Sequence, residues 1–204
     1  MSEHLQARMA ERLDIVDAYG NPTGEALDKK TIHAQGLRHR DVHVWVTDGT
    51  HLLQQHRNED KKIMPGAWDI SVGEHVQEGE TFRDAAVRGT REELGLDLTP
   101  EDFMRIGRVS TQLQFPGWEH AHNIVGENFV YLDRQLRISD LKLQDEEVQG
   151  ARWYLIDRLE NDLIDPEKAL LHAPQPEVLY ALGTAGMRGV EAGYQYGIEP
   201  VRLA

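Results

Sequence analysis

Residues 73–96 constrain this chain more than any other segment, because they join a turn-rich loop to a helix with an unusual acidic pattern. On a helical wheel, four small or apolar side chains share one arc: Phe82, Ala85, Ala86 and Gly89. Glu93 projects into the middle of that arc, and Glu92 lies at its edge. Burying a carboxylate on such a face is costly unless something pairs with it. A hard divalent cation would relieve both charges; a solvated acidic helix, or one paired with Arg88 and Arg91, is the alternative.

The segment resembles the Nudix box, whose pattern is G-x5-E-x7-R-E-U-x-E-E-x-G-U with U an aliphatic residue. The chain matches this pattern at the correct spacing at six positions: Glu80, Arg88, Glu92, Glu93, Gly95 and Leu96. The resemblance implies an α/β (α+β) fold in which a mixed sheet lies between helices, as an α/β/α sandwich. It also implies metal-dependent chemistry on a diphosphate.

The chain departs from this pattern at three positions. Glu74 stands at the first glycine, although Gly73 matches a second glycine that is common there. Thr90 occupies the first aliphatic position. Gly89 replaces the first glutamate after the arginine, so a carboxylate that often binds metal or acts as a base in the family is missing. Gly89 either leaves space for water, metal or substrate, or allows close packing against a strand.

Composition narrows the classes of function. The 204 residues are 40% hydrophobic and 28% charged, which suits one domain with a full core. No apolar run approaches the roughly 18 residues of a membrane helix, and the N-terminus lacks a signal-peptide core, so we expect a cytoplasmic protein with no membrane contact. Cysteine is absent, which excludes disulfides and thiolate chemistry. The net charge of −13 argues against DNA binding.

Apolar alternation predicts the strands, and glycine and proline mark the turns between them. Strands are expected at residues 12–17, 42–47, 51–56, 68–72, 104–112, 124–132 and 151–155. Helices are expected at about 81–94, 155–163 and 176–182. These elements predict a single domain over residues 1–204, with its core at about 12–163 and a C-terminal helix and tail at 164–204.

The resemblance also assigns a metal site. It implies that Glu92 and Glu93 bind Mg²⁺ (or Mn²⁺), with the backbone carbonyl of Gly73 as a third ligand. Mg²⁺ takes only a few carboxylates and keeps water and substrate oxygens. Glu80 would pair with Arg88 and fix the loop against the helix, with a metal role as the alternative.

Because Gly89 removes one carboxylate, another residue must supply a base alongside Glu93, or the activity is weak. Glu127 is the first candidate, since its predicted strand resembles the glutamate-bearing strand of relatives of isopentenyl diphosphate isomerase. Glu146 and Glu147 precede a later strand and come next. For each of these three glutamates, an exposed strand or solvated loop is the alternative.

The similarity to the isomerase subgroup covers roughly residues 12–163 and is looser than the box. It rests on five short stretches: residues 37–40, Arg57, 61–62, 65–66 and 68–69. His33, His39 and His75 fall near positions that bind metal in that isomerase, while a structural or surface role is the alternative. His120 and His122 add a local pair.

Substrate-binding candidates lie on either side of the box. Arg57, Lys61 and Lys62 could hold phosphates, although a solvated basic loop fits the same residues. Trp118 lies in a loop at residues 114–123, where it could stack on a nucleobase or cap the core.

The leading hypothesis is a metal-dependent hydrolase of nucleoside diphosphates or other diphosphate-linked compounds. An isopentenyl diphosphate isomerase-like enzyme is the first alternative, but its mechanism resembles a cysteine-plus-glutamate one and this chain has Gly73 at the relevant position. A non-catalytic nucleotide-binding module is the second, because of Gly89. The expected partner is a small-molecule diphosphate, and the sequence leaves a homodimer open.

Overall fold

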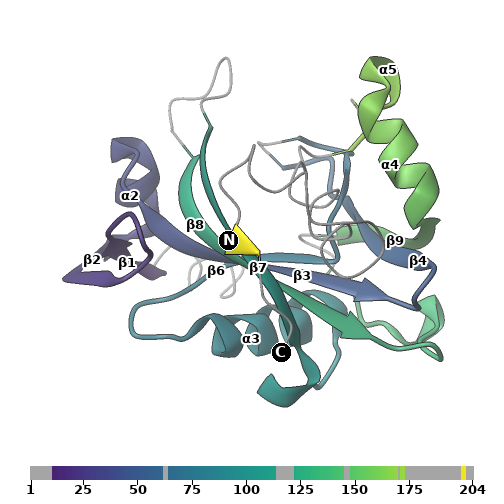
Figure 1. Ribbon diagram of the computed structural model, residues 1–204, viewed down its shortest axis with the longest axis horizontal. Helices are drawn as coiled ribbons and strands as arrows, with labels where there is room; N and C mark the ends of the chain where they lie inside the picture. Colours follow the sequence, from purple (N-terminus) through teal and green to yellow (C-terminus); the bar gives the residue numbers. More distant parts are fainter. Residues whose placement is uncertain are drawn as a thin grey trace.

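A mixed β-sheet with helices on both faces forms the core of the computed structural model (Figure 1). The structure describes residues 11–61, 64–113, 122–144, 148–169, 171–172 and 199–200. The strands are β1 (Arg12–Val16), β2 (Pro22–Asp28), β3 (His39–Thr47), β4 (His51–Arg57), β5 (Trp68–Asp69), β6 (Val72–His75), β7 (Met104–Leu113), β8 (His122–Leu132), β9 (Val148–Leu155) and β10 (Glu199–Pro200). The helices are α2 (Lys29–Gln35), α3 (Phe82–Leu94), α4 (Ile156–Ile164) and α5 (Pro166–Ala169), with 3-10 turns at Pro100–Asp102 and Ile138–Asp140.

These strands form two separate sheets. β1 and β2 form an antiparallel pair, and the larger sheet has the order β10-β7-β8-β3-β4-β5. Off this path, β6 pairs with β3 and β9 pairs with β4. β3 and β8 are parallel along their shared length, whereas β7 and β8 are antiparallel. The central strand β3 is therefore flanked on both edges, which explains why almost all of its residues are buried.

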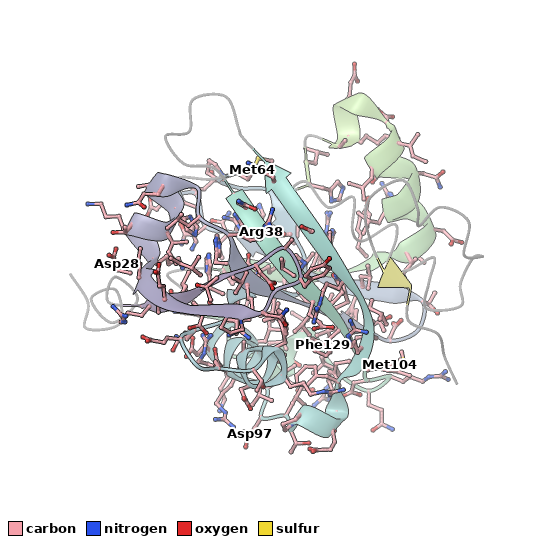
Figure 2. The ribbon with its side chains drawn as sticks, turned by 60° about the vertical axis from the view of Figure 1, so that its left-hand side comes forward. Asp28, Arg38, Met64, Asp97, Met104 and Phe129 are labelled. Atoms are coloured by element: carbon pink, nitrogen blue, oxygen red, sulfur yellow. The ribbon has the colours of Figure 1, made fainter. Side chains whose placement is uncertain are left out.

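Alternation along β3 divides the core into two layers, as the period of two in a strand requires. Val42, Val44 and Val46 pack with the buried alanines of α3, whereas Trp45 packs with α4. Phe129 of β8, labelled in Figure 2, belongs to the layer on the α3 side. Figure 1 shows α3 on one side of the sheet and α4 with α5 on the other. The predicted α/β/α arrangement is confirmed.

Both ends of α3 are set by local sequence. The Thr81 hydroxyl accepts from the backbone N–H of Asp84, and the Asp84 carboxylate accepts in return from the backbone of Thr81, so a capping box begins the helix. Gly95 ends it in the left-handed region, with φ 70°, as a glycine just after a helix often does. The predicted helix at 81–94 is confirmed to within one residue.

Beneath α3, two different strands pair with β3. β4 is registered with β3 at Thr47↔Leu52, while β6 pairs with β3 at residues 41–44. The Ser71 hydroxyl connects β3 with β4. It donates to the carbonyl of Leu53 on β4 (2.5 Å) and accepts from the N–H of Val46 on β3 (2.8 Å). β4 and β6 therefore both present side chains to the same helix.

Some boundaries differ from the expected ones. The strand expected at 68–72 is two short strands, β5 and β6, because residues 70–71 turn the chain between different partners. Helix α2 was not predicted, since it has seven residues and little periodicity, although Asp28 caps its first turn and Gly36 ends it with φ 61°. Figure 2 labels Asp28 at the start of this helix. The helix expected at 176–182 lies outside the described residues.

Candidate functional site

The inner face of α3 carries the predicted carboxylate. Ala85, Ala86, Gly89 and Glu93 are all buried, as the helical wheel predicted. Glu93 is 4% exposed, and one of its carboxylate oxygens accepts a hydrogen bond of 3.0 Å from the Nε2 of Gln55 on β4. The neutral amide of Gln55 orients this carboxylate.

Arg88 organises the other acidic groups around α3. Its Nε and Nη2 donate to the two carboxylate oxygens of Glu80, each at 3.0 Å, which confirms the predicted pairing. Its Nη1 lies 3.3 Å from a Glu74 oxygen and 3.6 Å from a Glu92 oxygen. Nη2 also donates to the carbonyl of His75 at 2.8 Å. Burial by itself lowers the pKa of Arg88, but the hydrogen bond to Glu80 and the neighbouring negative charges raise this pKa above its ordinary value.

The acidic cluster is defined as Glu74, Glu80, Glu92 and Glu93, and Arg88 forms ion pairs with the first three. Glu74 is 2% exposed and Glu93 4% exposed, so water screens neither well. Carboxylates gathered in this way favour a cation, and carboxylate oxygens are the ligands that Mg²⁺ and Mn²⁺ prefer. The donor set therefore fits a divalent cation, although Gly73, the exposed residue of β6, keeps its ligand role only as a prediction.

Glu127 lies on β8 and faces the same helix layer as Phe129. It is 4% exposed, and both of its carboxylate oxygens are engaged, one by the Nε of Arg105 and the other by the Nη2 of Arg108 (3.0 Å). These contacts connect β7 and β8. Its role as a base stays a prediction, but the geometry gives it a structural role as well.

Replacing Glu127 separates these roles. We expect Glu127→Gln to lower the melting temperature by several degrees, because two guanidinium groups lose their carboxylate, at a cost of about 1–3 kcal/mol. Turnover measured well below the melting temperature decides whether Glu127 also acts as a base. A loss of turnover with unchanged metal affinity supports that role, and unchanged turnover contradicts it.

Other predicted site residues fall in different places. The Nη1 of Arg57 lies 2.6 Å from a carboxylate oxygen of Asp69, so this guanidinium is held between β4 and β5. The backbone N–H of Lys61 donates to the carbonyl of Asn58 within a turn. Lys62, Trp118 and Glu147 lie outside the described residues.

A histidine cluster lies beside the acidic cluster, built from His33 of α2, His39 of β3, His75 of β6 and His122 of β8. The ring centroids of His33, His39 and His75 are 4.9–5.3 Å apart, and the Nε2 atoms of His33 and His75 are 3.0 Å apart. Asp41 completes the cluster, with an oxygen 3.8 Å from His39 Nε2 and 3.9 Å from His75 Nε2. Sequence reasoning missed Asp41, although its spacing of two from His39 on a strand places both side chains on one face.

A hydrogen bond to the backbone fixes the tautomer of His39 in this cluster. His39 Nδ1 donates to the carbonyl of Leu37 at 2.9 Å, which makes Nε2 the lone-pair nitrogen of a neutral ring. That buried Nε2 and the Oδ1 of Asp41 have no hydrogen-bond partner. His33, His39 and His75 form one group whose ligand atoms lie within 4.8 Å of one another, and His39, Asp41 and His122 form a second; either donor set fits a transition metal such as Zn²⁺ or Mn²⁺. The histidine cluster is thus a second place where a metal could bind.

Acid should destabilise the metal-free protein through this cluster. Burial lowers the pKa of His33 to about 4 and holds the pKa of His75 well below its ordinary value. Above pH 6.5 these rings are neutral in both states, so they impose no penalty. As the pH falls from 6.5 toward about 4, the unfolded chain binds protons that the folded chain does not, and stability is lost. Melting temperatures measured with a chelator across this window should fall with pH.

The matched variant is His33→Gln/His75→Gln, which removes both titrating rings. Its melting temperature should depend less on pH between 6.5 and 4 than that of the unaltered protein. An equally steep dependence in both proteins contradicts a role for these histidines in acid unfolding.

Comparisons with known proteins agree with the fold and the box. A NUDIX domain profile matches residues 37–174. The chain is 30% identical over 162 residues to Nudix hydrolase 3 of Arabidopsis thaliana. The aligned region covers 78% of this chain and 21% of that protein, so this chain spans about a fifth of that relative. It is 31% identical over 149 residues to an isopentenyl-diphosphate Delta-isomerase of Escherichia coli, with 70% of this chain and 76% of that one covered.

The fold has solved counterparts. A crystal structure of a Deinococcus radiodurans protein superposes with a TM-score of 0.58 at 18% sequence identity, covering 84% of this chain and 97% of that one. With the profile match over most of the chain, the acidic helix after a glycine turn, and the layered sheet around it, the conclusion is that this chain is a member of the Nudix hydrolase family.

Proposed function

We propose that this protein is a metal-dependent hydrolase of nucleoside diphosphates or other diphosphate-linked compounds. The observation that carries the proposal is the acidic cluster, in which one guanidinium forms ion pairs with three carboxylates and the buried carboxylate of Glu93 lies on the same helix. A diphosphate brings further negative charge, so a site that accepts it needs divalent cations. The box resemblance and the family membership support the same reading.

In this proposal each side chain has a physical task. Glu92 and Glu93 hold Mg²⁺ (or Mn²⁺), and Gln55 fixes the carboxylate of Glu93 through its amide. Arg88 clamps the loop through Glu80, which keeps the turn against the helix. The bound cation would supply charge neutralisation at the phosphate oxygens and a more acidic water.

The proposed partner is a small-molecule diphosphate, with Arg57 and Lys61 as candidate phosphate contacts. The net charge of −13 does not favour DNA as a partner. Among the described residues, every helix is too short or too polar to cross a bilayer. A cytoplasmic location and a homodimer remain part of the proposal.

One observation favours the isomerase-like alternative, and one opposes it. The histidine cluster lies where the sequence resemblance placed a metal site of isopentenyl diphosphate isomerase. The mechanism implied by that resemblance uses a cysteine, and the position holds Gly73 in a chain without cysteine. The hydrolase therefore remains the leading proposal, and a nucleotide-binding module without turnover is the third reading.

A substrate panel tests the proposal directly. The protein is incubated with nucleoside diphosphates, nucleoside diphosphate sugars, dinucleoside polyphosphates and isopentenyl diphosphate, each with Mg²⁺, with Mn²⁺ and with a chelator. Metal-dependent cleavage at a diphosphate supports the hydrolase. Isomerisation of isopentenyl diphosphate without cleavage would replace it with the isomerase, and tight nucleotide binding with no turnover would replace it with a binding module.

A further inference from the structure

Two positions that depart from the box pattern touch each other in the fold. A Cβ at position 89 would lie 3.0 Å from the Cβ of Glu74, 3.2 Å from its Cγ and 3.0 Å from the Cγ1 of Val72. Those distances are shorter than ordinary carbon–carbon contacts. The side chain of Glu74 on β6 therefore occupies the volume that a side chain at position 89 of α3 would need.

The box pattern has a glycine at position 74 and a glutamate at position 89, and this chain has the reverse. The exchange keeps one small residue and one carboxylate at the same point between strand and helix. From this contact we infer that Glu74 supplies the cation-binding carboxylate that Gly89 no longer provides. The inference rests on the proposed function, because it names a further ligand of the same metal site.

Ion pairs with Arg88 place Glu74 beside the proposed metal ligands. Glu80 already satisfies Arg88 with two hydrogen bonds, so Arg88 does not need Glu74 for its neutralisation. Yet Glu74 is 2% exposed and reaches the same guanidinium nitrogen as Glu92, at 3.3 Å and 3.6 Å respectively. Glu74 therefore lies beside Glu92, one of the two carboxylates proposed to hold the cation.

The backbone also aims this carboxylate. One of its oxygens accepts from the N–H of His75 at 2.9 Å, which holds the side chain toward the end of β6. Position 74 pairs with Val42 of β3, whose neighbours form the layer beneath α3. A glutamate on β6 thus reaches the acidic cluster from the sheet, whereas a glutamate at position 89 would have reached it from the helix.

Metal titration tests the inference with a readout that does not depend on turnover. Mn²⁺ binding is followed by electron paramagnetic resonance for the unaltered protein, Glu74→Gln, Glu93→Gln and the control Glu78→Gln, whose carboxylate is about half exposed and pairs with Arg12. Glu74→Gln keeps the shape of the side chain and should raise the dissociation constant for Mn²⁺ at least about tenfold. Substituting a residue that only contacts a metal ligand already weakens metal binding about 10- to 100-fold. Glu78→Gln should leave that constant unchanged.

The reciprocal exchange adds a second, structural test. Gly89→Ala should lower the melting temperature when Glu74 is present and lower it less in a Glu74→Gly background, because the two side chains compete for one volume. The double variant Glu74→Gly/Gly89→Glu should bind Mn²⁺ more tightly than Glu74→Gly alone, since it returns the carboxylate to the helix.

The outcomes separate this inference from the proposed function. If Glu93→Gln loses Mn²⁺ while Glu74→Gln binds it as the unaltered protein does, the metal site stands and the role of Glu74 is wrong. An exchange variant that binds no better than Glu74→Gly also overturns the inference. If the unaltered protein binds no Mn²⁺ or Mg²⁺ and cleaves no diphosphate, the proposed function fails and the role of Glu74 with it.

Discussion

Glu93→Gln should abolish most Mg²⁺ binding and lower the rate of diphosphate cleavage at least about 100-fold. Substituting a residue that only contacts a metal ligand already lowers metal affinity or activity about 10- to 100-fold, and Glu93 is proposed to be a ligand itself. The substitution keeps the size of the side chain and its contact with Gln55, and it removes only the charge. The metal-free variant should melt at the same or a higher temperature, since a buried charge is gone. Calorimetric metal titration and steady-state kinetics measure the two effects.

Glu101→Gln is the matched control, because Glu101 is exposed on the 3-10 turn after α3. This variant should retain metal affinity, turnover and melting temperature. Turnover by Glu93→Gln at the unaltered rate would show that the acidic cluster is not the catalytic site.

Asp14→Ala should cause the largest loss of stability, about 3–5 kcal/mol, because it leaves the charge of Arg40 buried and unpaired. The two side chains are about one-tenth exposed, and Arg40 Nη2 lies 2.8 Å from the Asp14 carboxylate. The same carboxylate oxygen accepts from the N–H of Gly79 in the loop before α3. Chemical denaturation of the metal-free protein measures the change in the free energy of unfolding.

Glu78→Ala provides the comparison, since it breaks the ion pair with Arg12 in which both side chains are about half exposed. Exposed pairs contribute little, so this variant should unfold at nearly the same denaturant concentration as the unaltered protein. An Asp14→Ala protein that is as stable as Glu78→Ala would show that the buried pair does not hold the loop.

The sequence was most informative where local chemistry decides the structure. The capping residues Thr81 and Gly95 gave the limits of α3, and the small residues on one face placed Glu93 inside. The pairing of Glu80 with Arg88 followed from the box pattern and is present. These features depend on residues within about fifteen positions of one another, which is the range that periodicity and capping can describe.

What the sequence could not provide depends on distant segments. The contact of Glu74 with Gly89 requires knowing that β6 packs on the helix turn that contains residue 89. Asp41 joins the histidine cluster because β3 brings it beside His75 of β6. Glu127 was read as a candidate base, but the two arginines that engage it come from the neighbouring antiparallel strand β7. The periodicity of the sequence cannot predict these contacts, because they depend on which distant strands pair and in what register.

The parallel pairing of β3 with β8 has a consequence for how the chain reaches this fold. Arg38, just before β3, donates through Nε to the side-chain oxygen of Asn123 across 85 residues of sequence. Closing so long a loop costs entropy before any contact compensates for it, and such nonlocal pairings slow folding. During synthesis, at about 5–20 residues per second, β3 must wait several seconds for its parallel neighbour. Until β8 emerges, one hydrogen-bonding edge of the most buried strand stays open, and that is the interval in which this protein is most exposed to misassociation.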